Sequence, residues 1–165
     1  MLDNHAKLVK VIASSDGIVG RKKLQKIIYI LKKLGYPFEE KYTFHFYGPY
    51  SEELTLRMEE LTNLGFVSEV HEQKSNYYQY RYEVTEQGED FLTHSNASIP
   101  DVDMLVNDMT NQSSRFLELV ATMLYFDDLS KEEVEQKVQE VKKKSNYTLE
   151  DLEAGWHYIQ TLKNQ

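Results

Sequence analysis

The side chains that most often carry catalysis or bind metals are few in this sequence and lie far apart. The five histidines form no H-E-x-x-H motif and no paired spacing suited to a metal ion: His5, His45, His71, His94 and His157. Paired aspartates occur at Asp127-Asp128 and at Asp101 and Asp103, but both pairs fall at expected helix ends, where helix capping explains them. We therefore predict no catalytic residue, no metal site and no cofactor.

Motifs for a serine nucleophile or a phosphate-binding loop are also absent. The sequence contains no G-x-S-x-G, G-x-x-x-x-G-K or G-x-G-x-x-G, and it has only seven glycines. The lack of cysteine excludes disulfides and fits a reducing cytoplasm. The first residues lack the pattern of a secretion signal, and no apolar run approaches the ~18 residues of a membrane span. We predict a cytoplasmic protein that is not an enzyme and has no membrane partner.

Most of the net charge of −8 is carried by the second half of the chain. Residues 1–95 contain 12 basic and 14 acidic side chains, whereas residues 96–165 contain 7 and 13. A protein with this balance is not steered towards phosphate backbones. Any nucleic-acid function must therefore depend on a local basic patch.

One face of the helix expected over residues 21–34 provides such a patch. At 100° per residue, Lys22, Lys26, Tyr29 and Lys33 share a narrow stripe of this helix. One interpretation of this stripe is that its side chains contact phosphate groups. The alternative is that it is an ordinary solvent-exposed face of the helix. Two further cations lie in a hairpin expected later in the chain. The candidate nucleic-acid-binding residues are Arg21, Lys22, Lys23, Lys26, Lys74 and Arg81.

Residues 51–92 contain the clearest pattern of elements that could position these side chains. Ser51 precedes a helix with leucine or methionine at 54, 58, 61 and 64, and Gly65 ends it. A strand is expected over 66–71, a polar turn over 73–76, and a second strand in which Tyr78, Tyr80, Tyr82 and Val84 alternate with polar residues. Thr85 then caps another helix. This order resembles the third helix and wing of bacterial winged-helix proteins.

The link between the second and third helices is unusual for a helix-turn-helix. Such helices are normally joined by a turn of only ~3–4 residues. Here some fifteen residues intervene, from Gly35 to Tyr50. Residues 42–47 alternate like a strand, and Gly48-Pro49-Tyr50 is expected to be a sharp turn into the third helix.

The expected third helix carries four glutamates on the face that a winged-helix protein would turn towards DNA. Glu52, Glu53, Glu59 and Glu60 point away from the core and would meet phosphates unfavourably. Leu56 lies among them and could mark a protein contact or be an isolated surface leucine. The aromatic residues of 42–50 could stack on bases or simply fill a half-buried sheet. The candidate protein-interaction residues are Tyr47, Tyr50, Glu52, Leu56, Glu59 and Glu60.

A family resemblance is carried by the segment Lys23-Leu24-Gln25-Lys26-Ile27-Ile28-Tyr29, followed by an aromatic strand and Gly48-Pro49-Tyr50-Ser51. With these residues the chain resembles the YwgA family of bacterial proteins over nearly its whole length. Residues 21–55 are also similar, more distantly, to the Panacea antitoxin domain. Panacea domains act by binding partner proteins, so this second resemblance implies interaction rather than catalysis.

The remainder of the chain, from about Ile99, is expected to be helical. Residues 116–126 are apolar almost all round, with Glu118 and Thr122 as polar breaks, and should form the most buried helix. Ser130 and Glu133 form a capping box, and Thr148 caps a last helix. The joint between the two parts is expected at 96–100. Trp156 and the apolar stripe of the last helix predict a homodimer.

The predicted fold is mainly α with a small antiparallel β-hairpin. Residues 1–95 form a winged helix-turn-helix-like domain, and residues 96–165 form a C-terminal helical bundle packed on the first domain or on a dimer partner. The favoured function is a DNA-binding regulator that contacts duplex DNA. The alternative is a protein-interaction module, similar to the Panacea domain, that does not bind DNA. Fold alone does not decide between them.

Overall fold

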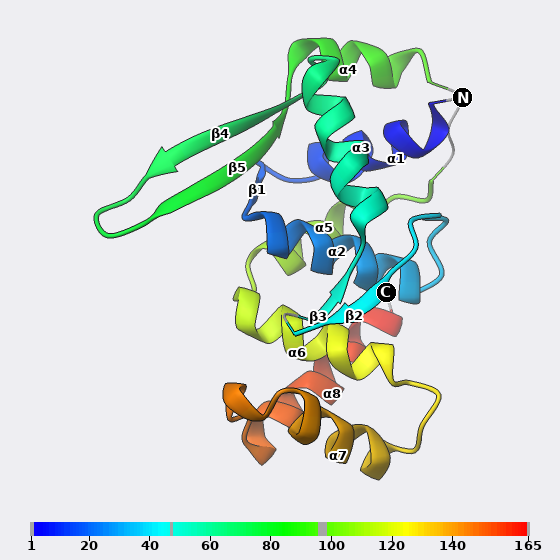
Figure 1. Ribbon diagram of the computed structural model, residues 1–165. Coiled ribbons are helices and arrows are strands. Elements are labelled where there is room, and N and C mark those ends of the chain that lie inside the picture. Colours follow the sequence, from blue (N-terminus) through cyan, green and yellow to red (C-terminus); the bar gives the residue numbers. More distant parts are fainter. Residues whose placement is uncertain (1, 47, 96–98, 165) are drawn as a thin grey trace.

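The described part of the chain forms eight α-helices and two small antiparallel sheets (Figure 1). This computed structural model describes residues 2–46, 48–95 and 99–164. The prediction of a mainly helical fold with a small antiparallel β-hairpin is therefore confirmed. None of the described helices is both long and apolar enough to cross a membrane.

The first half surrounds a three-stranded sheet with helices. Strand β5 lies between β1 and β4, and both neighbours run antiparallel to it. Glu69 of β4 pairs with Tyr82 of β5, which fixes the register of the hairpin. The elements are α1 (Asp3–Ala13), β1 (Ile18–Val19), α2 (Arg21–Lys33), α3 (Glu52–Asn63), β4 (Val67–Gln73), β5 (Tyr78–Val84) and α4 (Glu86–Thr93).

Local signals in the sequence explain where α3 and the hairpin begin and end. The hydroxyl of Ser51 accepts a hydrogen bond from the Leu54 amide at the start of α3. Gly65, with a φ of +82°, turns the chain directly after α3. Val67 and Tyr82 are buried at the base of the hairpin. The rest of the hairpin projects from the body of the molecule, as Figure 1 shows.

The segment before α3 differs from the prediction. Residues 48–50 are not a simple turn but a short strand, β3 (Gly48–Tyr50), which pairs antiparallel with β2 (Thr43–His45). Gly48 has a φ of +97°, a conformation that favours glycine, and its position brings the chain back beside β2. Pro49 is tolerated because this sheet has only two strands and leaves edges unpaired.

The second half packs against the first mainly through one helix. Helix α6 lies between α2 and α8, and its buried residues join a hydrophobic core that continues into both halves. The predicted capping boxes at Ser130 and Thr148 are both present. Of the predicted joint at 96–100, residues 96–98 lie outside the described residues. The elements are α5 (Asp103–Thr110), α6 (Ser114–Tyr125), α7 (Lys131–Val141), the 3₁₀-helix η1 (Lys143–Ser145) and α8 (Leu149–Lys163).

The apolar stripe of α8 is used within the chain. Leu152, Ile159 and Leu162 are buried in the core, and Trp156 donates a hydrogen bond from Nε1 to Glu135 at 2.8 Å. The apolar stripe of α8 is therefore packed within the chain, while Trp156 stays half-buried, and the homodimer remains a prediction.

Candidate functional site

A cleft of about 610 Å³ lies between the first turn of α2, the outer face of α3 and the base of the β4–β5 hairpin. Its volume is typical of a pocket that binds a small ligand or a side chain of a partner. Leu24, Leu54 and Met58 supply the apolar part of its lining. The polar part comes from Arg21, Lys22, Gln25, Tyr50, Thr55, Glu59, Thr62, Asn63, Glu69 and Tyr82.

The hairpin wall of the cleft is held by a network around Glu69. Arg21 donates to Glu69 Oε1 at 2.8 Å, and the hydroxyl of Tyr82 donates to Oε2 at 2.5 Å. The guanidinium of Arg21 also lies 3.9 Å from the centre of the Tyr80 ring. Burial alone would raise the pKa of the Glu69 carboxyl, but the hydrogen bonds from Arg21 and Tyr82 outweigh it and lower that pKa. The charge of Arg21 is thus matched by a half-buried carboxylate.

The helical wall is built on Gln25, the central polar residue of the sequence segment that carries the family resemblance. Its Nε2 donates to the Ser51 carbonyl at 2.9 Å, and its Oε1 accepts from the Ser51 amide at 2.9 Å. Thr55 accepts a second bond from Nε2, and its hydroxyl lies 2.8 Å from that of Tyr50. Gln25 therefore fixes the start of α3 relative to α2.

The predicted basic stripe of α2 is only partly on the surface. Lys26 is 2% exposed and Tyr29 is also buried, because α6 covers this side of the helix. The prediction that Lys26 contacts phosphate is therefore wrong, since a duplex cannot reach it. Its Nζ lies 3.6 Å from Glu118 Oε1 on α6.

A second buried lysine shares the same carboxylate. Lys142, at the end of α7, is 3% exposed, and its Nζ lies 3.4 Å from Glu118 Oε2. The same ammonium donates a hydrogen bond to the Phe46 carbonyl. Burial lowers the pKa of both Lys26 and Lys142, against the opposing effect of Glu118. This Lys26–Glu118–Lys142 cluster holds two cationic groups and one anionic group.

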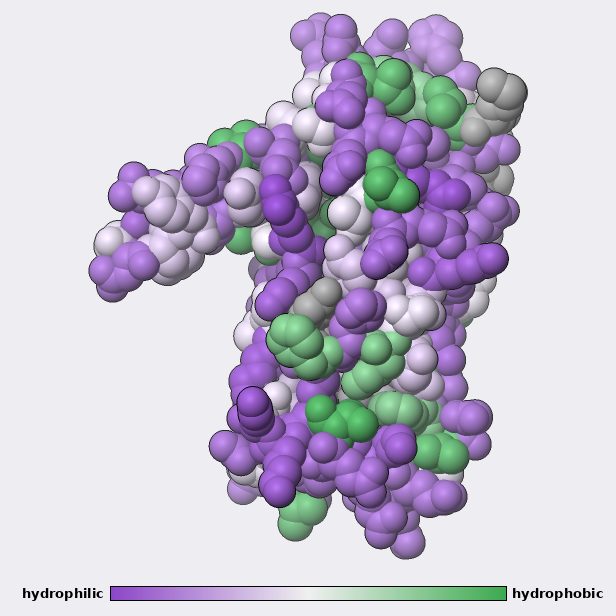
Figure 2. Space-filling model, in the orientation of Figure 1, coloured by the Kyte–Doolittle hydropathy of each residue, from purple (hydrophilic) through white to green (hydrophobic). Residues whose placement is uncertain are grey.

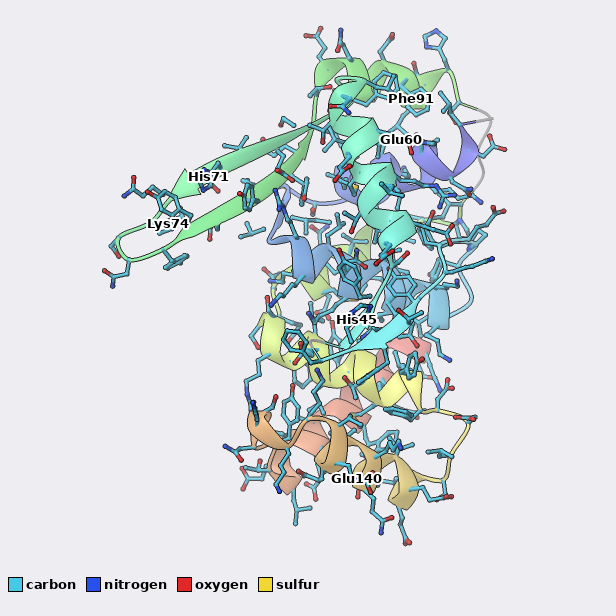
Figure 3. The ribbon with its side chains drawn as sticks, viewed as in Figure 1. His45, Glu60, His71, Lys74, Phe91 and Glu140 are labelled. Carbon is cyan, nitrogen blue, oxygen red and sulfur yellow. The ribbon has the colours of Figure 1, made fainter. Side chains whose placement is uncertain are left out.

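The other candidate nucleic-acid-binding residues do not form a common basic surface. Lys23 donates to the Thr110 carbonyl at 2.8 Å and so ties α2 to α5. Arg81 bonds Glu83 and the Asp16 carbonyl, and Lys74 lies 3.9 Å from Glu72. Figure 3 shows His71 and Lys74 on the projecting part of the hairpin. Lys22 is exposed at the rim of the cleft.

The candidate protein-interaction residues lie mainly on α3. Leu56 is 57% exposed, and Glu52 and Glu59 are also exposed. Glu60 is exposed and its carboxylate lies 3.1 Å from His5. Tyr50 is half-buried and lines the cleft. Tyr47 lies outside the described residues.

Sequence reasoning missed Glu118, Lys142 and Glu69. A lone carboxylate in the apolar run of residues 116–126 was a usable signal, because a charge in such a helix indicates a buried partner. Neither Glu69 nor Lys142 had a comparable local signal. In the described ranges, no group of three or more histidine, aspartate or glutamate side chains could hold a metal ion.

Comparison with known proteins gives a relative that matches along nearly the whole chain. Over 163 residues the chain is 56% identical to the protein "Uncharacterized protein YwgA" of Bacillus subtilis (strain 168). The match covers 99% of this chain and 98% of that protein. No family model matches the chain.

Proposed function

The chain belongs to the YwgA family, and we propose that it is a protein-interaction module that binds its partner through the outer face of α3 and the adjoining cleft. In this proposal α1, β1, α2, α3 and the β4–β5 hairpin form a winged-helix-like unit, because their order matches that fold. The helix and hairpin that would contact DNA in such a unit would here contact a protein.

The observation that carries the proposal is the pairing of charges on this face. Arg21 at the cleft is bonded to Glu69, and Lys26, which lies on the side of α2 that α6 covers, is buried beside Glu118. Within the described residues, Glu52 and Glu59 have no cation at ion-pair distance. Docking on a duplex would place these carboxylates against phosphates, and each would lose hydration.

The exposed leucine on the same face also supports a protein partner. Leu56 is 57% exposed on α3, whereas Leu24, Leu54 and Met58 at the floor of the cleft are buried in the core. Binding energy at protein interfaces is concentrated in a few apolar or aromatic contacts surrounded by polar groups. The distant resemblance of residues 21–55 to the Panacea domain favours the same function.

Duplex DNA binding is the competing hypothesis, and one pair of measurements separates the two. A labelled duplex is titrated with the purified protein at about 50 mM salt and again at about 200 mM salt. We expect the protein to show no affinity for the duplex that falls as the salt concentration rises. Affinity that falls steeply with salt and is lost in Lys22→Glu would favour the DNA-binding regulator instead.

The second measurement is capture of partners from nuclease-treated lysate. We expect a protein that is retained by the wild type and lost with Leu56→Glu. The matched control is Leu149→Glu, because Leu149 is a similarly exposed leucine (74%) on α8, away from the cleft. If Leu56→Glu and Leu149→Glu lose the captured protein equally, capture depends on the overall polarity of the surface rather than on α3. That result would contradict the proposal.

A further inference from the structure

The β2–β3 hairpin presents a large apolar side chain to solvent. Phe46 is 85% exposed at the end of this hairpin, whereas the hairpin's other phenylalanine, Phe44, packs on α6. In Figure 2 hydrophobic residues gather over this hairpin and the neighbouring parts of α6 and α7, below the largely hydrophilic surface of α3. His45, labelled in Figure 3, marks the position of the hairpin.

The backbone that carries Phe46 is fixed from beneath. The buried ammonium of Lys142 donates to the Phe46 carbonyl and lies 3.4 Å from Glu118. A Cβ added to Gly48 would lie 3.4 Å from the Glu118 side chain, so the returning strand approaches α6 closely. The Phe44 ring lies 5.1 Å from that of Tyr125 and 5.5 Å from that of Phe126. The hairpin is therefore held to α6 and α7 on both sides of Phe46.

This attachment is costly by itself. Two ammonium groups share one carboxylate in the Lys26–Glu118–Lys142 cluster, and each buried charge loses hydration. An apolar cluster of the same volume would hold the hairpin at no such cost. The carbonyl of Phe46, however, needs a donor, and Lys142 supplies it from a distant helix. The arrangement holds the Phe46 carbonyl in place at the expense of stability.

The charge around the hairpin end differs from that of the rest of the molecule. The cluster beneath it contains one more cation than anion. Lys22 is exposed and close enough to act electrostatically on both lysines of the cluster. Lys143 and Lys144, directly after Lys142, are exposed as well. Lys22, Lys143 and Lys144, here called the basic rim, thus add positive charge next to the cluster that holds the Phe46 carbonyl, on a protein of net charge −8.

We propose that Phe46 is a pre-organised anchor that inserts into an apolar pocket of a partner protein whose rim carries aspartate or glutamate. Fixing the backbone before binding reduces the entropy that association must remove. An aromatic anchor in a desolvated pocket is typical of interface hot spots. The basic rim favours a carboxylate-rimmed pocket and disfavours a basic one. This inference rests on the proposed function, since it names the anchor and the chemistry of the same partner.

The test begins with the partner captured by the wild-type protein, identified by mass spectrometry and then purified. Its dissociation constant is measured by calorimetry for Phe46→Ala and for Met104→Ala, where Met104 is 78% exposed on α5. We expect the dissociation constant to rise at least about tenfold for Phe46→Ala and to stay unchanged for Met104→Ala. Lys143→Glu with Lys144→Glu should weaken binding more at low salt than at high salt.

A second variant tests the attachment of the hairpin. Lys142→Met leaves Lys26 and Glu118 as a matched pair, so the fold is kept, and circular dichroism checks this. We expect a smaller rise in the dissociation constant than with Phe46→Ala. An unchanged dissociation constant would overturn the role of Lys142.

The remaining outcomes separate this inference from the proposed function. If Leu56→Glu abolishes binding and Phe46→Ala does not, the inference is wrong and the proposed function stands. If the wild type captures no protein, both are wrong. Binding to vesicles of anionic lipid that is lost with Phe46→Ala would assign the hairpin to a membrane surface and overturn the inference.

Discussion

Two basic positions of α2, one helical turn apart, look alike in the sequence and differ in the structure. Arg21 and Lys22 line the cleft beside α3, and Arg21 is bonded to a carboxylate of the hairpin. Lys26, one turn further along, lies in the interior between α2 and α6 and shares Glu118 with Lys142. Arg21 and Lys22 are exposed at the cleft, whereas Lys26 joins the two halves of the chain.

The difference shows that the partner of a lysine decides its role more than its place on a helix does. A basic stripe at helical spacing is compatible with solvent, with phosphate or with a buried carboxylate. Here the carboxylate comes from α6, far along the sequence. The segment Lys23–Tyr29 therefore positions elements: Lys23 bonds the end of α5, Gln25 bonds the start of α3, and Lys26 meets α6.

The largest effect that would test this comparison is expected for Glu118→Gln. The substitution leaves two buried ammonium groups without a counter-charge, so we expect the free energy of unfolding to fall by about 3–5 kcal/mol. Urea denaturation measures the loss. Lys26→Met is the matched control, because it leaves one cation with one anion, and we expect it to stay within about 1 kcal/mol of the wild type. If Glu118→Gln lowers the free energy of unfolding no more than Lys26→Met does, the three charges do not form a buried ionic cluster.

A smaller effect is expected for Gln25→Ala. The change removes the acceptor of the buried Ser51 amide and the donor to the Ser51 carbonyl, so we expect a loss of about 1–3 kcal/mol. Thermal or urea unfolding measures it. Gln136→Ala, at an exposed position of α7, should change stability by less than about 0.5 kcal/mol. If Gln25→Ala and Gln136→Ala lower the free energy of unfolding equally, Gln25 does not fix the start of α3.

The smallest effect is expected on the cleft face, for Arg21→Ala. Arg21 is largely exposed, so the loss at pH 7 should be no more than about 1 kcal/mol. Folding lowers the pKa of Glu69, so the ionised Glu69 carboxylate contributes to stability above the ordinary pKa of a glutamate. That contribution is lost as the pH falls through the pKa of Glu69 in the folded protein. The difference between Arg21→Ala and wild type should therefore disappear in acid, as urea unfolding at a series of pH values would show. A difference that is constant with pH would contradict the Arg21–Glu69 network.

The sequence by itself determined the elements whose signals are local. Ser51, Ser130 and Thr148 mark helix starts because their hydroxyls accept bonds from amides only three residues away. The alternation from Tyr78 to Val84 set the strand, because side chains of a strand point to opposite sides in turn. Of its predicted buried face only Tyr82 is buried, and Tyr78 is 62% exposed. The exposure of Leu56, Glu52, Glu59 and Glu60 followed from helical periodicity in the same way, whereas Glu53 is half-buried.

Only the tertiary structure decided which charges meet and which surfaces stay open. Residues 48–50 became a strand because β2 lies beside them, and the stripe of α8 was covered by its own chain. Lys26, Glu118 and Lys142 come from three helices, and no local pattern links them. Ion pairing acts through space over a few ångströms, so its partners are set by packing rather than by spacing along the sequence.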